Sequence, residues 1–407
     1  MNLMLVVNWY PPDRRVPARR WGNIVAEFQK QGINTTVVSA GNGNESETIG
    51  SHGEQIIRLP ISNQNTAGAT GSTSFEKSRV RKSLGKIFSF CCPPILRDFS
   101  SIKWFFQYFY EPRLIATASQ ADVIISSYGP LGPLMLGSIL ACKAQKTFII
   151  DIRDSFEARD GISCKLGQAI SRRIERHLLA LARMRITVGD TLAGHLESVY
   201  HLKFMSLYNG WTDDDLVYRS PNPDHSLFYA GTIYQHQLDA LAIVLQGLIR
   251  SQGLRLRIRL LNDNTNGDLL RLIQTLKAEH LVDILPPADN SVIKEEMSSA
   301  AAVLVLEDLY AASPWATGTI TGKFFGLLAS GVPGIVVANP RGELWKLASN
   351  SDTLRCAHTL LEFQQALEKI TELSPRKMNQ TWLSSYSVHT QTKKFIQRLT
   401  HAQTSIY

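Results

Sequence analysis

Short apolar runs alternate with helical patterns along almost the whole chain, and this alternation constrains the fold more than any other feature. The predicted strands are 3–7, 35–38, 122–126, 147–151, 184–188 and 204–208 in the first half, and 227–231, 256–261, 282–285, 302–307 and 334–338 in the second half. Strands that alternate with helices are typical of a doubly wound parallel sheet. Two successive sets of this kind predict an α/β protein with two similar domains.

The length agrees with two domains, because 407 residues exceed what one ordinary hydrophobic core supports. We place the first domain at 1–205, the second at 206–385, and a last helix within 386–407, after the second sheet is complete. Residues 41–86 are rich in small polar side chains that cannot bury a core, so we expect a mobile insertion there.

The positive charge of the chain lies in its first half. The formal net charge is +8; residues 1–205 hold 25 Lys and Arg against 16 Asp and Glu, whereas the remainder holds 18 against 19. A basic half should meet an anionic partner, and both nucleic acid and a membrane that carries an anionic lipid-linked substrate are candidates. A solvated basic face without a partner is the alternative.

Cysteine usage and hydropathy bear on the compartment. The five cysteines form no CxxC pattern and no Cys/His metal spacing, which indicates reduced thiols and predicts a cytoplasmic protein. The N-terminus resembles a strand and not a signal peptide, and no apolar stretch is long enough to span a membrane. Segment 88–113 mixes aromatic and basic residues, which fits either an amphipathic segment on the inner face of a membrane or ordinary burial.

The stretch from Thr317 to Leu344 has the pattern of a phosphate-binding loop and helix. Thr319 and Thr321 are candidate N-caps, and Gly322 lets a ligand approach the backbone. Lys323 places a cation in the first helical turn, where the helix dipole disfavours it unless an anion offsets it. We therefore predict an anion site; a lysine that points into water is the alternative.

A second turn of this type follows the predicted strand 227–231. Gly231 and Thr232 turn the chain before a helix, and His236 could contact a phosphate or lie in water. The GxGxxG pattern is absent, so the turn carries no Rossmann dinucleotide fingerprint.

Charged side chains follow two strands of the first domain. Four arginines that suit bidentate anion binding follow the first strand, namely Arg14, Arg15, Arg19 and Arg20. The strand 147–151 ends in Asp151, which we expect to be structural, while Arg153 and Asp154 lie further out, where a cleft should open.

Together these motifs resemble the family-4 glycosyltransferases of the GT-B fold, in particular a bacterial subgroup of polysaccharide and glycoconjugate pathways. YPPDRRVPARRW is similar to the Pro-Pro loop of that subgroup, DVIISSYGPLGPLMLG to its ISSPP segment, and DIRDSF to its DxRDPW segment. LYNGW resembles its Asn-Gly domain junction, YAGTIY its first donor turn, and GKFFGLLASGVPGIV its GKLFEYLASGRPIL segment. The likeness covers nearly the whole chain.

The resemblance implies a GT-B architecture, in which two Rossmann-like domains face a cleft and the last helix crosses back to the first domain. It also implies transfer of a sugar, with retention, from a nucleotide sugar to an acceptor hydroxyl of a glycan, a lipid-linked intermediate or a small molecule. The implied donor residues are Gly231, Thr232, His236, Thr319, Thr321, Gly322, Lys323 and Gly326. The implied acceptor or anion residues are Arg14, Arg15, Arg19, Arg20, Tyr128 and Arg153, with Asp154 and Lys323 as catalytic residues.

Two positions depart from the family pattern. Gly318 and Gly326 stand where the family commonly holds two glutamates, so a non-catalytic GT-B relative or partner subunit is the alternative function. An intact anion loop around Gly326 favours altered nucleotide recognition, for example of a dTDP-sugar. We expect no metal cofactor, because the acidic run of 212–216 follows the domain junction and no DxD lies in a donor loop. No nucleic-acid-binding motif is present.

Overall fold

The computed structural model describes residues 1–13, 15–41, 44–61, 93–153, 165–217, 220, 222–251, 253–260, 267–322, 324–370 and 380–404. The chain divides into two compact units. The first consists of Met1–Val188, Ala193–Leu207 and Thr392–Tyr407, and the second of Gly189–Leu192 and Tyr208–Gln391.

An eight-stranded sheet forms the centre of the first unit, in the order β3-β4-β2-β1-β5-β6-β7-β8. Its strands are β1 (Asn2–Val7), β2 (Asn34–Gly41), β3 (Ser46–Ile49), β4 (Gln55–Pro60), β5 (Val123–Tyr128), β6 (Thr147–Ile152), β7 (Met184–Thr187) and β8 (Met205–Ser206). Neighbouring strands are parallel except β3, which pairs antiparallel with β4. The chain runs outward from β1 to β2 and β4 and later returns to the other side of β1 with β5. The order of the strands therefore reverses at β1, where open α/β sheets bind ligands.

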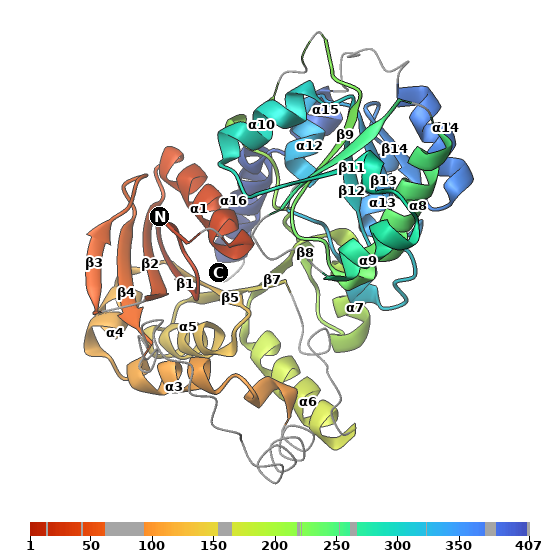
Figure 1. Cartoon of the computed structure of the whole chain (residues 1–407). Coiled ribbons are helices and arrows are strands. Elements are labelled where there is room, and N and C mark those ends of the chain that lie inside the picture. The colour runs from red at the N-terminus through yellow and green to blue at the C-terminus, as the bar shows by residue number, and fades with distance from the viewer. Residues whose placement is uncertain are drawn as a thin grey trace, which may run out of the picture. The chain divides into compact units, whose positions relative to one another are not determined.

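Helices cover both faces of this sheet. They are α1 (Val16–Lys30), α3 (Phe99–Tyr108), α4 (Pro112–Gln120), α5 (Leu131–Ala144), α6 (Lys165–Leu181) and α7 (Asp190–Tyr200), with a short helical turn, η1 (Pro94–Leu96), before α3. Figure 1 shows α1 on one face of the sheet and α5 on the other. Because the sheet is covered on both sides, β5 is buried along its whole length.

The final helix, α16 (Val388–Thr404), returns to the first unit, as the resemblance implied. Phe395 is fully buried, and its ring lies against Phe28 of α1 with the ring centroids 6.2 Å apart. Leu399, one turn further along the same face of α16, is also buried. The two aromatic rings and Leu399 dock the C-terminal helix on α1.

A six-stranded parallel sheet forms the second unit, in the order β11-β10-β9-β12-β13-β14. Its strands are β9 (Ser226–Ala230), β10 (Arg255–Arg259), β11 (Val282–Leu285), β12 (Ala302–Leu306), β13 (Gly334–Val337) and β14 (Leu354–Ala357). Its helices and helical turns are η3 (Asp213–Asp215), η4 (Gln235–Gln237), α8 (Leu238–Arg250), α9 (Gly267–Thr275), η5 (Glu279–Leu281), α10 (Asn290–Ser299), α11 (Pro314–Gly318), α12 (Phe324–Ser330), α13 (Glu343–Ser349), α14 (Leu360–Ile370) and α15 (Gln380–Ser384). Successive residues of β9, such as Leu227 and Phe228, enter two different core clusters, so this sheet too is covered on both faces.

The expected mobile insertion at 41–86 is corrected for residues 44–61, which form the β3–β4 hairpin. β4 buries Ile56, Ile57 and Leu59 in the core and pairs with β2. The abundant small polar residues around these apolar side chains hid the strands from an argument based on composition. The rest of the insertion, 42–43 and 62–86, lies outside the described residues.

The aromatic segment 88–113 divides between burial and exposure. Helix α3 buries Trp104, Phe105 and Tyr108, and the Trp104 indole donates a hydrogen bond to the Leu59 carbonyl at 3.2 Å. Other large apolar side chains of the segment face solvent, notably Phe99, Phe106 and Tyr110. Residues 88–92 lie outside the described part of the chain. None of the helices in the described ranges combines the length and the apolar character that crossing a membrane requires.

Candidate functional site

A buried carboxylate at the end of β6 organises the carboxyl edge of the first sheet. Asp151 is fully buried and accepts hydrogen bonds from Arg20 Nη2 at 3.2 Å, from the Trp21 indole at 3.1 Å and from the Ser127 hydroxyl at 2.8 Å. The Arg153 Nε atom lies 3.6 Å from the same carboxylate. Asp151 therefore links β5, β6 and α1, which agrees with the structural role expected for it.

This network bears on three of the residues expected on the acceptor side, Arg20, Tyr128 and Arg153. The Arg20 side chain is fully buried and also donates to the Leu207 carbonyl at 2.8 Å, so it is a structural residue and not a ligand-binding one. Tyr128 is only 1% exposed, and the Arg153 side chain lies against Asp151 with little exposure. Arg19 is exposed on α1. Arg14 and Asp154 lie outside the described residues.

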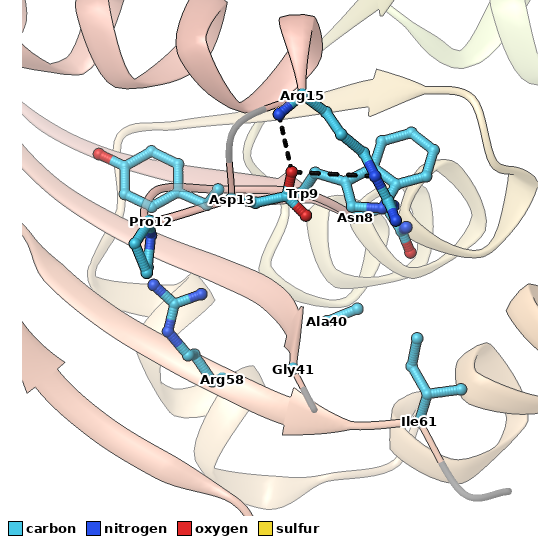
Figure 2. Close-up of a pocket in the computed structure, with 10 residues that line it drawn as sticks. Asn8, Trp9, Pro12, Asp13, Arg15, Ala40, Gly41, Arg58 and Ile61 are labelled. Atoms are coloured by element: carbon cyan, nitrogen blue, oxygen red, sulfur yellow. Dashed lines mark hydrogen bonds and ion pairs between the residues drawn. The ribbon is translucent and has the colours of Figure 1, made fainter. Parts of the chain in front are cut away.

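A cavity of about 400 Å³ lies where β1, β2 and β4 end in the first unit (Figure 2). Its lining consists of Asn8, Trp9, Tyr10, Pro12, Asp13, Arg15, Ala40, Gly41, Arg58 and Ile61. Of the arginines expected at this edge, Arg15 is the one that lines the cavity among those that the structure describes. Figure 2 shows its side chain beside the Trp9 ring, with the guanidinium carbon 5.0 Å from the ring centroid.

Sequence reasoning missed the second arginine of this cavity, Arg58. It lies on β4, within the stretch expected to be an insertion. The register places Arg58 beside Ser39 of β2, and β2 lies next to β1. The short run of apolar residues in QIIRLP, namely Ile56, Ile57 and Leu59, is the sequence signal that could have identified this strand.

The loop that carries Trp9 is anchored by a buried polar pair. The Tyr10 hydroxyl donates a hydrogen bond to Glu54 Oε1 at 2.8 Å, and both residues are almost fully buried. Burial, together with the Glu54 carboxylate, holds the pKa of Tyr10 well above its ordinary value. Tyr10 therefore stays a protonated donor and ties the loop after β1 to the turn between β3 and β4.

In the second unit, the predicted glycine turn follows β9 directly. Gly231 has φ 144°, a backbone conformation that favours glycine, and its N–H donates to the Arg259 carbonyl at 2.8 Å. The Tyr229 hydroxyl donates to the Thr232 carbonyl at 2.9 Å. The buried Gln237 side chain donates to the Leu306 carbonyl at 2.8 Å. These contacts hold the turn against the ends of β10 and β12.

His236 does not point into this packed turn. Its ring is exposed and stacks on Tyr234, with the ring centroids 5.6 Å apart and the planes 6° from parallel. The pair forms a flat aromatic surface next to Gly231.

Glu307, which sequence reasoning also missed, follows β12 at the same edge. Burial raises the pKa of Glu307 to about 7, with repulsion from Asp308 as a further cause. Its carboxylate also acts on Tyr229, whose pKa is raised mainly by burial and further by Glu307. A half-buried carboxyl group that titrates near neutral pH is a candidate functional group when it lies at the ligand-binding edge of a sheet.

Of the two threonines expected as N-caps, Thr319 has another partner. The Thr319 hydroxyl donates to the Trp315 carbonyl at 2.9 Å, so it closes α11 and does not cap α12. The Thr321 carbonyl accepts from the Phe324 N–H at 3.0 Å. Gly322 lies two positions before Phe324, the first residue of α12, and Lys323 lies outside the described residues.

The two glycines that replace the family's glutamates are in different environments. A Cβ atom on Gly318 would lie 3.3 Å from the backbone nitrogen of Leu192, which is a tight contact. A Cβ atom on Gly326 would lie 3.6 Å from Asp215 Oδ1, an ordinary contact with a carboxylate. A glutamate at Gly318 would therefore displace its neighbour, whereas one at Gly326 would meet like charge.

A buried carboxylate supports the junction segment LYNGW. Glu343 is 3% exposed and accepts hydrogen bonds from the Tyr208 hydroxyl at 2.5 Å and from the Thr191 N–H at 2.9 Å. Burial alone would raise the pKa of Glu343, but hydrogen bonds from Thr191 and Tyr208 lower it overall.

Within the described residues, no group of three or more His, Cys, Asp and Glu side chains is arranged to hold a metal ion.

The glycine environments predict opposite effects of the same substitution. Gly318→Ala should lower the free energy of unfolding by about 1–2 kcal/mol, because the added methyl overpacks against Leu192. Gly326→Ala should raise it by up to about 1 kcal/mol, because alanine suits the interior of α12 and finds space there. Urea denaturation of both variants measures the difference. Equal effects would contradict the packing described for Gly318.

Glu307 predicts a pH dependence of stability. Because burial raises the pKa of Glu307 from 4.5 to about 7, the folded state holds a proton that the unfolded state releases, and stability falls as the pH rises through this window. Between pH 5 and pH 8 the free energy of unfolding should therefore fall by up to about 3 kcal/mol more in wild type than in Glu307→Gln. Denaturation at both pH values measures it, with the exposed Glu279→Gln as control. Parallel pH profiles for wild type and Glu307→Gln would contradict the raised pKa.

Comparisons with known proteins were made for the whole chain. No protein-family model matches it, and a search of curated proteins gave no match either. Solved structures do match. HepE from Anabaena, in complex with UDP and glucose, is 13% identical; the match covers 98% of this chain and 100% of that chain, with a TM-score of 0.62.

Two further structures give the same result. The catalytic domain of starch synthase IV from Arabidopsis thaliana, bound to ADP and acarbose, is 10% identical over 99% of both chains, with a TM-score of 0.61. The lipopolysaccharide outer core galactosyltransferase WaaB is 11% identical over 100% of both chains, with a TM-score of 0.59. At these low sequence identities the matches show a similar fold, but they do not show which reaction or substrate this chain has. With its two parallel-sheet units and a last helix that returns to the first, the chain has the GT-B fold.

Proposed function

We propose that this protein is a glycosyltransferase that moves a sugar from a nucleotide sugar to an acceptor hydroxyl, with retention of the anomeric configuration. The observation that carries the proposal is the edge where β9 and β12 end, since β9 is the strand at which the order of the second sheet reverses. There the Gly231–Thr232 turn follows β9, and Glu307, whose pKa burial raises to about 7, follows β12.

The ligands of the similar structures support a nucleotide-sugar donor. HepE has been solved with UDP-glucose, and starch synthase IV with ADP and acarbose. Both match this chain over nearly its whole length. We extend to this chain the inference that a nucleoside diphosphate binds in the second unit.

We assign the donor diphosphate to the Gly231–Thr232 turn and to the Thr319–Gly322 stretch, with Lys323 as the cation that stabilises the leaving group. Such catalysis is electrostatic, since charge and backbone dipoles stabilise the phosphate as the glycosidic bond breaks. Gly326 leaves a ribose contact open, which suits a deoxyribose donor such as a dTDP-sugar. Asp154 would act on the acceptor side. No metal cofactor is part of this proposal.

A non-catalytic role is the second candidate, and Gly318 is the observation that favours it. A Cβ atom there would lie 3.3 Å from Leu192, so the family's glutamate would require Leu192 to shift. A protein of this kind would bind a nucleotide sugar without turning it over.

We propose that the acceptor belongs to glycan or glycoconjugate synthesis. The protein would be cytoplasmic and would bind peripherally to the inner face of a membrane. The supporting surface is the outer side of α3 and its flanks, where Phe99, Phe106 and Tyr110 are 57–67% exposed. Exposed Lys103 lies on the same helix, and the Lys143 ammonium lies 3.8 Å from the centroid of the Tyr110 ring. Exposed aromatic and cationic side chains together favour an anionic membrane interface.

Turnover tests the function. A panel of UDP-, ADP- and dTDP-sugars with crude cell-envelope acceptor should give transfer, or slow hydrolysis without acceptor, and activity should persist after EDTA treatment. Thermal stabilisation by each free nucleotide is measured in parallel. If nucleotides stabilise the protein against heat but no turnover occurs, the non-catalytic alternative is supported and the enzymatic function is contradicted. Loss of activity in EDTA would contradict metal independence.

Lys323→Ala should weaken binding of UDP or dTDP by about 1.5–3 kcal/mol, because it removes a charge-assisted contact to the diphosphate. Isothermal titration calorimetry measures the affinity. Lys369→Ala, which removes an exposed lysine from α14 of the same unit, is the matched control. Equal affinities of the two variants would remove Lys323 from the donor site.

Flotation tests the membrane surface. The protein should float with vesicles of phosphatidylglycerol and phosphatidylcholine at low salt and less at high salt, because charge and apolar insertion act together. Phe106→Ser should reduce flotation several-fold, whereas Leu361→Ser, at an equally exposed position of the second unit, should not. If no protein floats at either salt concentration, the α3 surface has no role at membranes.

A further inference from the structure

Two guanidinium groups line the cavity of the first unit, and the first of them, Arg58, is anchored from below by neutral oxygens. It donates hydrogen bonds to the Pro11 carbonyl and, at 3.4 Å, to the Ser39 hydroxyl. Because neither partner is charged, these two contacts orient the guanidinium without neutralising its positive charge. Gly41 leaves room for the stem of Arg58, since a Cβ atom there would lie 3.1 Å from the Arg58 Cβ atom.

The second guanidinium, that of Arg15, is held at the rim. Its side chain is 61% exposed, stacks on Trp9, and has its Nε atom 3.9 Å from Asp13 Oδ1. The same Asp13 oxygen accepts the Arg15 backbone N–H at 2.8 Å, so part of its accepting capacity serves the turn into α1. Figure 2 shows the Asp13 carboxylate and the Arg15 side chain on the same loop, with Arg58 on the strand below them.

The cavity carries a net positive charge. Among the described residues that line it, two are arginines and Asp13 is the sole carboxylate. Tyr10 contributes no charge, because its hydroxyl is committed to Glu54. Trp9, Pro12, Ala40 and Ile61 supply apolar surface of the kind that the C–H face of a sugar ring contacts. A volume of about 400 Å³ is within the range of small-ligand sites.

We propose that this cavity binds an acidic acceptor, a sugar that carries a phosphate or carboxylate group, through the guanidinium groups of Arg58 and Arg15. Planar guanidinium groups match the oxygens of either anion bidentately. That the bound sugar is an acceptor rests on the proposed glycosyltransferase function. Anion binding does not depend on that function, and the site lies wholly within the first unit.

Binding to the full chain tests the proposal without any need for turnover. Calorimetry or saturation-transfer NMR at low ionic strength compares glucose 1-phosphate, glucuronate and neutral glucose as probes. One or both acidic probes should bind at least tenfold more tightly than glucose, and the stronger one identifies the anion. Arg58→Gln should weaken the acidic probe at least tenfold, Arg58→Lys by less, and Arg183→Gln, an exposed arginine of the same unit, by less than twofold.

Arg15→Gln provides a variant at an exposed position, where folding is not at risk, and should weaken the acidic probe at least threefold. The proposal is overturned if glucose binds as well as both acidic probes, or if neither Arg58→Gln nor Arg15→Gln changes the affinity. Nucleotide binding, measured in parallel, tests the donor site of the second unit separately from the anion site of the first unit. If UDP and dTDP fail to bind while the acidic probe binds through Arg58, the donor assignment falls and the anion site stands.

Discussion

The buried carboxylate of Asp151 is the interaction on which the first unit depends. A charge without exposure is costly, and here it is balanced by Arg20 and by hydrogen bonds from Trp21 and Ser127. Because these partners lie on α1 and β5, one carboxylate fixes how the first helix packs against two central strands. Removing one partner of such a pair typically costs about 3–5 kcal/mol. The direction in which the loop before α1 leaves the sheet, and with it the position of Arg15, follows from this anchor.

Both units place their candidate ligand-binding groups at the same kind of position. In each sheet the strand order reverses at the first strand of the unit, β1 or β9, and the loop that follows that strand carries the candidate residues. Trp9 and Arg15 follow β1, and Gly231 and Thr232 follow β9. Parallel strands bring the loops of neighbouring strands to one edge, so Arg58 and Glu307 join these groups from distant parts of the sequence. The positive cavity and the carboxyl group that titrates near neutrality thus have a common topological origin.

The two glycines at the expected glutamate positions have different physical meanings. Gly318 is required by packing, because Leu192 occupies the space that a side chain would need. Gly326 is not, since its helix leaves ordinary space beside the Asp215 carboxylate. Packing therefore opposes any side chain at position 318, whereas at position 326 only a negatively charged side chain is opposed. The sequence pattern alone treats both as the same loss.

The sequence by itself determined the two parallel-sheet units, the glycine turn after β9 and the buried role of Asp151, because these follow from local periodicity, glycine conformation and the burial of a strand. It missed β3, β4 and β14, whose sequences SETI, QIIRLP and LRCA carry only weak local patterns. Only the tertiary structure decided which arginines face a cavity. Arg15 and Arg20 lie near each other in sequence, yet Arg15 lines the cavity and Arg20 is fully buried in an ion pair with Asp151. Arg58 reaches the same cavity through the pairing of β4 with β2, a non-local contact that no local pattern encodes.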